Sequence, residues 1–95
     1  MMDLKIIEEL LETIRNRKQF PKEGSYTNKL FNKGENGLVK KLGEENAELI
    51  KAFLVENDER MASEAADYLY HIIVALEYRG VPFEDVLNIL RQRHA

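Results

Sequence analysis

The stretch AADYLYHIIVAL, residues 65–76, constrains the fold of this chain more than any other segment. It is apolar on nearly every side of a helix, which predicts burial, yet Asp67 and His71 lie one helical turn apart on the same face. A buried carboxylate needs a partner, so this position requires a cation or a hydrogen-bond donor nearby. Because a chain of 95 residues has few other helices to cover the segment, we expect a second copy, in a symmetric dimer, to complete the cover.

Apolar spacing, proline and glycine predict the other elements. A helix over residues 3–18 ends at the Phe20–Pro21 pair, because a residue before proline is pushed out of helical geometry. One short helix over residues 28–33 fits the long connection that follows, with Thr27 as its N-cap and Gly34 as its stop. Three more helices are expected over residues 38–56, capped by Asn36, over residues 59–79, ended by Gly80, and over residues 82–93, opened by Pro82.

No segment shows the alternation of polar and apolar residues that is typical of a strand. The predicted fold class is therefore all-α, with a single domain over residues 1–95 folded as a compact helical bundle. The chain has no cysteine, which excludes disulfides and thiolate metal sites. No apolar run approaches the roughly 20 residues of a membrane span, and the N-terminal segment is unlike a targeting signal. We therefore expect a cytoplasmic protein that does not contact membranes.

The charges are unevenly distributed along the chain. The net charge is only -3, which argues against a nucleic-acid-binding protein. Residues 15–41 are mainly basic, whereas residues 42–85 are mainly acidic. This distribution is consistent with a phosphate site beside a cation site, or with ordinary solvated faces.

Two pairs of acids with the same spacing occur on successive predicted helices. Glu45 and Glu48 lie three residues apart in EENAE, and Glu64 and Asp67 lie three residues apart in EAAD. The short connection between the helices requires antiparallel neighbours, so the pairs could close around one or two divalent cations. An all-carboxylate site suits Mg²⁺ or Mn²⁺ rather than zinc. The alternative is that the acids line an exposed groove and pair with Lys or Arg.

His71 has two interpretations of its own. A lone histidine on an apolar face is most often a core residue with satisfied hydrogen bonds. Its position one turn after Asp67 also allows a contact to a substrate phosphate or to a ligating carboxylate.

EENAE followed by EAAD resembles the E-x-x-E … E-x-x-D signature of the all-α nucleoside triphosphate pyrophosphatases, the MazG-like superfamily. Within that superfamily the chain is most similar to the phosphoribosyl-ATP pyrophosphatase family of histidine biosynthesis. The segments that carry this similarity are RNRKQFPKEGSYTNKLFNKG, KKLGEENAEL and EAADYLYHIIVAL. The resemblance extends from Leu4 to the LRQRH segment at residues 90–94.

The resemblance implies hydrolysis of phosphoribosyl-ATP between its α and β phosphates, giving phosphoribosyl-AMP and pyrophosphate, the second step of histidine biosynthesis. It also implies Mg²⁺ as the cofactor, with Mn²⁺ as a possible substitute. The metal ligands carried over from the family pattern are Glu45, Glu48, Glu64 and Asp67. Glu44 would be catalytic: it could ligate the metal, or orient or deprotonate the attacking water. Residues expected to meet phosphates or sugar are Lys18, Ser25, Tyr26, Thr27, Lys40, Lys41 and His71.

The chemistry also follows from the residue types. Phosphoanhydride hydrolysis requires charge neutralisation and a positioned water more than covalent help. The sequence has no Gly-rich phosphate loop and no evident Ser or Cys nucleophile with a base partner, so direct attack by water is expected. Two alternatives remain open: a MazG-like house-cleaning pyrophosphatase acting on ordinary or deoxy nucleoside triphosphates through the same four acids, and a non-catalytic helical dimerisation module whose acids are solvated.

Overall fold

The computed structural model describes residues 2–94, which form five α-helices and no strand. The bounds of the helices are Lys5–Gln19 for α1, Tyr26–Asn32 for α2, Gly34–Val55 for α3, Asp58–Arg79 for α4 and Phe83–Arg93 for α5. The predicted all-α fold class is confirmed over this range. Residues 1 and 95, the two ends of the expected domain, lie outside the described residues. Within residues 2–94, every helix is too short or too polar to span a bilayer.

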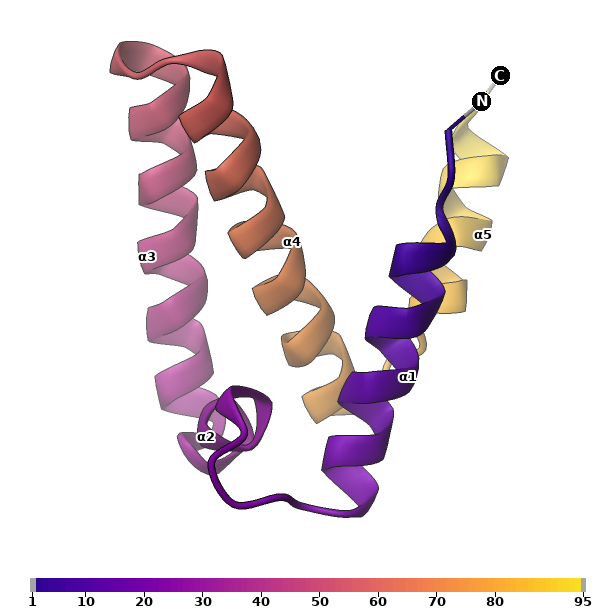
Figure 1. Ribbon diagram of the computed structural model, residues 1–95. Helices are drawn as coiled ribbons and strands as arrows, with labels where there is room; N and C mark the ends of the chain where they lie inside the picture. The colour runs from indigo at the N-terminus through magenta and orange to yellow at the C-terminus, as the bar shows by residue number, and fades with distance from the viewer. Residues whose placement is uncertain (1, 95) are drawn as a thin grey trace.

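The helices form two arms that diverge from a common base (Figure 1). One arm is the antiparallel pair of α3 and α4, which makes the most extensive packing contact in the chain. The other arm is formed by α1 and α5, on the opposite side of α4. The short helix α2 lies at the base, beside the start of α3, and contacts α1, α3 and α4. The long α3–α4 pair is thus the element that can bring distant acidic residues together.

The start of α2 differs from the sequence prediction. Ser25, not Thr27, is the N-cap, because its side-chain oxygen accepts a hydrogen bond from the backbone N–H of Asn28 at 3.3 Å. The helix begins at Tyr26, so Thr27 lies inside it and is buried. A hydroxyl at either position can cap a helix. In the structure the chain turns at Gly24, which has a positive φ of 84°, so the helix starts directly after Ser25.

The start of α3 was also predicted too late. The helix begins at Gly34 rather than residue 38, so Asn36 lies within its first turn and caps nothing. Gly34 does end the short helix, as predicted, but its left-handed φ of 72° also turns the chain directly into α3. The two helices are therefore separated by a single residue, Lys33, which places the GSYT segment close to the first turns of α3.

The hydrophobic core lies where the two arms meet. Ile14 from α1, Leu30 from α2 and Ile73 and Val74 from α4 are completely buried there. Further from the base the arms separate, and large apolar side chains remain exposed; on α3 these are Val39, Ile50, Phe53, Leu54 and Val55. Between α1 and α5 lies a largely apolar groove of about 870 Å³. Much of the apolar surface of each helix therefore has no cover within residues 2–94.

Arg15 joins the second arm to the base. Its Nε bonds the Oε1 of Glu77 on α4 at 2.8 Å, and its Nη2 bonds the Oε1 of Glu84 on α5 at 2.8 Å. The hydrogen bond from Arg15 lowers the pKa of the exposed Glu84 carboxyl. The guanidinium of Arg15 on α1 thus fixes the positions of α4 and α5 at the base where the two arms meet.

Candidate functional site

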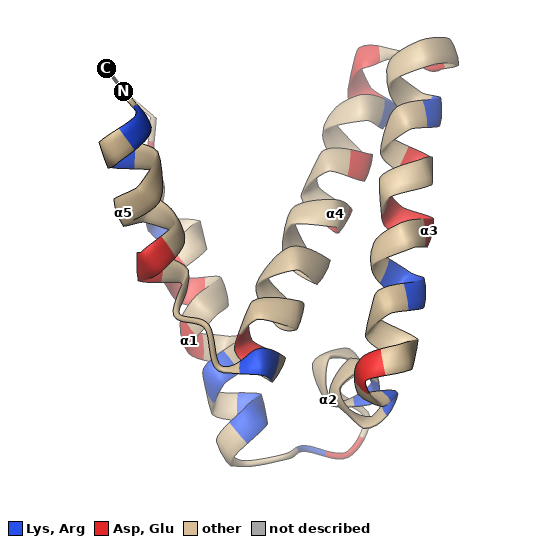
Figure 2. Cartoon of the chain, turned by 180° about the vertical axis from the view of Figure 1, so that it is seen from behind, with Lys and Arg blue, Asp and Glu red and all other residues tan. Residues whose placement is uncertain are grey.

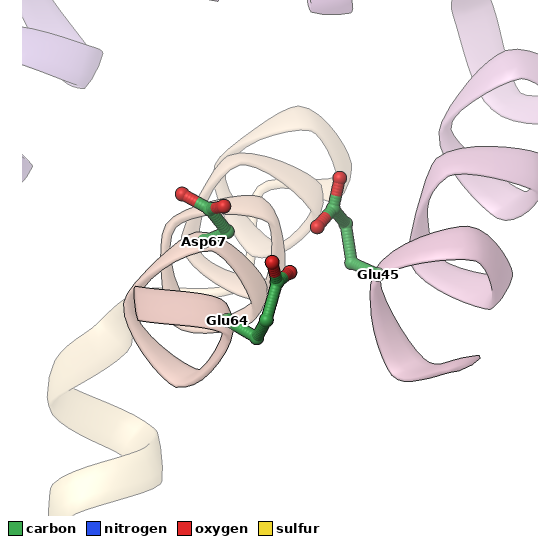
Figure 3. Close-up of side chains that lie close together, drawn as sticks. All are labelled: Glu45, Glu64 and Asp67. Carbon is green, nitrogen blue, oxygen red and sulfur yellow. The ribbon is translucent and has the colours of Figure 1, made fainter. Parts of the chain in front are cut away.

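The antiparallel pairing of α3 and α4 brings three carboxylates into one cluster. Glu45 projects from α3 toward Glu64 and Asp67 on α4 (Figure 3). One oxygen from each carboxylate lies within 4.8 Å of the others. Acidic segments occur at matching heights on the two helices (Figure 2), as the sequence spacing predicted.

The cluster combines buried and exposed acids. The Glu64 residue is only 6% exposed, Glu45 is half-buried and Asp67 is exposed. At 4.8 Å the repulsion of each pair of negative charges is about 1 kcal/mol in water and about 3 kcal/mol at the effective dielectric constant of a protein surface. Such a cluster is strained unless positive charge lies nearby.

Two basic side chains provide part of that charge. Arg60, one turn before Glu64 on α4, donates from Nη2 to Glu64 Oε1 at 2.5 Å. Lys41, one turn before Glu45 on α3, lies with its Nζ 3.4 Å from Glu45 Oε1. Asp67, the third acid, has neither partner in the described chain. The three carboxylates thus offer an incompletely neutralised set of oxygens that suits a hard divalent cation such as Mg²⁺ or Mn²⁺ better than zinc.

The ammonium of Lys41 places a positive charge beside the acidic cluster. Burial acts to lower the pKa of its ammonium, but the nearby Tyr26 oxygen and the Glu45 carboxylate outweigh that effect, so the pKa is raised. The negative charge of Glu44 adds to this rise in pKa. The ammonium therefore stays protonated next to the carboxylates, where it can meet a phosphate oxygen.

Other predicted residues on α3 lie outside the three-acid cluster. Glu48 and Glu44 are exposed, and the structure does not group their oxygens with those of Glu45, Glu64 and Asp67. Lys40 is exposed as well. The roles of Glu44, Glu48 and Lys40 stay predictions.

Three predicted substrate-binding residues have partners within the chain. Ser25 caps α2, as described above. The hydroxyl of Thr27 lies 2.5 Å from the hydroxyl of Tyr70 on α4, whose pKa is raised by burial. The ammonium of Lys18 donates to the backbone carbonyl of Glu77, near the C-terminal end of α4. The Ser25 contact stabilises the start of α2, whereas the Thr27 and Lys18 contacts hold α2 and α1 against α4. Whether a substrate also meets these residues stays a prediction.

His71 on α4 and Tyr26 in the GSYT segment connect α2 to the helix that carries Glu64 and Asp67. His71 is 5% exposed, and its Nδ1 donates to the backbone carbonyl of Asp67 at 2.6 Å. Its Nε2 lies 3.1 Å from the hydroxyl of Tyr26. His71 therefore contacts the proposed ligand Asp67, but through the backbone and not through the carboxylate.

Arg60 and Asn28 are site residues that the sequence analysis did not single out. Arg60 could have been found from its spacing of four residues before Glu64 on one helix. Asn28 is buried, and its amide donates to the Arg17 carbonyl at 2.8 Å and accepts from the Lys22 N–H at 2.9 Å. No sequence signal distinguishes such a buried amide, which fixes the loop before α2, from an ordinary surface asparagine.

Removing one of the clustered charges should stabilise the fold when no divalent cation is present. We expect Asp67→Asn to raise the free energy of unfolding in EDTA by about 1 kcal/mol, because it relieves repulsion from the two neighbouring carboxylates. Urea unfolding followed by circular dichroism measures this value. Glu9→Gln, which removes a charge at an exposed position on α1, outside the α3–α4 pair, is the matched control and should change little. A destabilised Asp67→Asn protein would contradict the repulsive cluster.

Comparison with known proteins identifies the chain's relatives. The sequence matches the family model of phosphoribosyl-ATP pyrophosphohydrolase over residues 7–94. A protein named phosphoribosyl-ATP pyrophosphatase from Lactiplantibacillus plantarum is 46% identical over 87 residues, which are 92% of this chain and 82% of that protein.

Two longer relatives are bifunctional. The histidine biosynthesis bifunctional protein HisIE of Prochlorococcus marinus is 48% identical over 88 residues, 93% of this chain but 40% of the relative. The HisIE protein of Pyrococcus furiosus is 47% identical over 90 residues, 95% of this chain and 42% of the relative. The chain thus spans about two fifths of the length of these bifunctional relatives. A family model that matches nearly the whole described chain, together with a relative covered over most of its own length, confirms the resemblance: the chain belongs to the phosphoribosyl-ATP pyrophosphohydrolase family.

Proposed function

We propose that this chain hydrolyses the α–β phosphoanhydride of phosphoribosyl-ATP with the help of Mg²⁺, giving phosphoribosyl-AMP and pyrophosphate in histidine biosynthesis. The observation that carries this proposal is the cluster of Glu45, Glu64 and Asp67 beside the charged Lys41. Family membership supports the substrate, and the cluster supports phosphate chemistry. The proposed location is the cytoplasm, where a multiply charged nucleotide is retained because it cannot cross a bilayer unaided.

Glu45, Glu64 and Asp67 are the residues that would hold the metal, and Glu48, one helical turn beyond Glu45 on α3, is the proposed fourth ligand. Mn²⁺, another oxygen-preferring cation, is the proposed substitute. A bound Mg²⁺ supplies charge neutralisation on the phosphate oxygens and lowers the pKa of water.

The protein's own side chains have separate roles in this proposal. Lys41, with Lys40 beside it in sequence, neutralises the negative charge on the phosphate oxygens as pyrophosphate departs. Glu44 is exposed next to Glu45 in sequence, and we assign it to orienting the attacking water or accepting its proton. Water attacks the phosphorus directly, the anhydride bond breaks, and the electron pair leaves with the pyrophosphate oxygen.

We further propose that the working form is a homodimer. The apolar segment of α4 that motivated this expectation still has exposed apolar residues in the monomer, including Ala65, Ala66 and Leu69. Exposed apolar residues also occur on α3 and α5, among them Phe53 and Leu90. A second copy of the chain is the occupant best suited to these faces, since identical apolar surfaces can cover each other around a two-fold axis.

The purified chain should release pyrophosphate from phosphoribosyl-ATP when Mg²⁺ is present and should not do so in EDTA. We expect Asp67→Asn to lower the rate at least about 100-fold, a loss typical of removing a group that organises charge in a transition state. Glu59→Gln, an exposed position in the first turn of the same helix, is the control and should retain full activity. A coupled assay that detects released pyrophosphate measures the rates of the wild-type chain and of both variants.

Other substrate profiles would point to the other two functions. Equal rates with dCTP, dUTP, ATP and phosphoribosyl-ATP would contradict the proposed substrate and support a house-cleaning pyrophosphatase. No pyrophosphate from any of these nucleotides would contradict enzymatic activity and support a helical dimerisation module.

Sedimentation equilibrium tests the proposed dimer. The wild-type chain should have twice the monomer mass, and Leu69→Lys should shift it toward the monomer because a buried, unpaired ammonium opposes association. Ser63→Lys places the same charge at an exposed position on the same helix and should leave the mass unchanged. A monomeric wild-type protein at micromolar concentration would contradict the dimer.

A further inference from the structure

His71 is held at both ring nitrogens in a place that a substrate cannot reach. The residue is 5% exposed, and the ring lies edge-on to Tyr26 and Tyr70, with centroid separations of 5.9 and 5.3 Å. Its Nδ1 contacts the Asp67 carbonyl at 2.6 Å, and its Nε2 contacts the Tyr26 hydroxyl at 3.1 Å. His71 therefore acts on any ligand through these partners.

The two partners determine which nitrogen carries the proton. A backbone carbonyl can only accept a hydrogen bond, so Nδ1 must be protonated to make the contact with Asp67. In a neutral imidazole the other nitrogen is then a bare acceptor. In this form of the ring, the hydroxyl of Tyr26, which lies 3.1 Å from Nε2, is the donor of the hydrogen bond between them.

This arrangement changes what Tyr26 can offer to a ligand. A phenol has a single proton, and with that proton committed to His71 the oxygen presents only lone pairs. Tyr26 is 47% exposed, so this oxygen lies at the edge of the site and not within the core. Phosphate oxygens are also acceptors, so the oriented hydroxyl cannot bind them. The group it binds must be a hydrogen-bond donor.

The position of Tyr26 indicates which donor. His71 joins Tyr26 to the backbone of Asp67 in the acidic cluster, because its Nε2 contacts the Tyr26 hydroxyl at 3.1 Å and its Nδ1 contacts the Asp67 carbonyl at 2.6 Å. The part of a nucleotide next to its phosphates is the ribose, whose hydroxyls are donors.

We propose that His71 is a positioning residue that fixes Tyr26 as a hydrogen-bond acceptor for a ribose hydroxyl of the nucleotide. The identity of the nucleotide rests on the function proposed above, whereas the orientation of Tyr26 does not. The residues of the GSYT segment then have separate roles. Ser25 caps α2, Thr27 attaches α2 to Tyr70 on α4, and Tyr26 accepts a hydrogen bond from the sugar.

The ring protons of His71 can be observed without any substrate. Nitrogen NMR at mildly alkaline pH should show Nδ1 protonated and Nε2 without a proton. A ring protonated at Nε2 would overturn the proposal, because the Tyr26 proton would then be free to bind a phosphate. This measurement stands even if the chain releases no pyrophosphate, so it separates failure of this proposal from failure of the proposed function.

Equilibrium binding of ATP and of its 2′-deoxy and 3′-deoxy forms, each with Mg²⁺, tests the recognition of the sugar. The wild-type chain should bind one of the deoxy forms about three- to tenfold more weakly than ATP, the effect of one hydrogen bond. Tyr26→Phe should bind all three alike. Equal binding of the three nucleotides by the wild-type chain would overturn the proposal.

Kinetics on phosphoribosyl-ATP test the link between the two side chains. Tyr26→Phe and His71→Leu should each raise KM about three- to tenfold and leave kcat within about twofold. The double variant should be no worse than either single one. His71→Gln can accept from Tyr26 and donate to the Asp67 carbonyl, so it should restore most of the wild-type KM. Additive effects, or equal defects in the Leu and Gln variants, would overturn the proposal.

Tyr78→Phe provides a matched control for these measurements. Its hydroxyl lies beside Gly34, at the start of α3, and takes no part in the contacts of His71. The variant loses a phenol hydroxyl without touching the proposed sugar contact, so its KM and its preference for ATP over the deoxy forms should match those of the wild-type chain.

Discussion

The mutual repulsion of three carboxylates between two antiparallel helices is the constraint on which the rest of the site depends. Glu45, Glu64 and Asp67 are brought within 4.8 Å of one another because α3 and α4 pair along their length. A helical pair of this kind normally excludes like charges from its seam, since each contact of this type costs free energy. Arg60 and Lys41 offset part of this repulsion, and the divalent cation that we propose would offset the rest.

The acidic cluster has polar neighbours on three helices. Lys41 on α3 contacts Glu45, and His71 on α4 joins Tyr26 on α2 to the backbone of Asp67. Under the proposals made above, the carboxylates would hold the metal, Lys41 would meet the phosphates and Tyr26 would accept a hydrogen bond from the sugar of one nucleotide.

The sequence predicted what local periodicity determines. The helical class, the left-handed Gly80 at the end of α4 and the convergence of three of the four paired acids follow from spacing and turn chemistry. The choice of Ser25 as a cap and the early start of α3 depend on the path of the chain at Gly24 and Gly34, which neighbouring helices set. The partners of His71 could not be predicted either, because Tyr26 reaches it only after α2 packs on α4. Local patterns thus determined the elements, and tertiary packing determined the hydrogen bonds.

Anomalous scattering from crystals soaked in Mn²⁺ tests most directly whether the seam between α3 and α4 is a metal centre. The account predicts a strong peak between the helices, at about 2.0–2.6 Å from carboxylate oxygens of Glu45, Glu64 and Asp67. The absence of a peak there, with Arg60 still bound to Glu64 and the other two carboxylates turned to solvent, would contradict it.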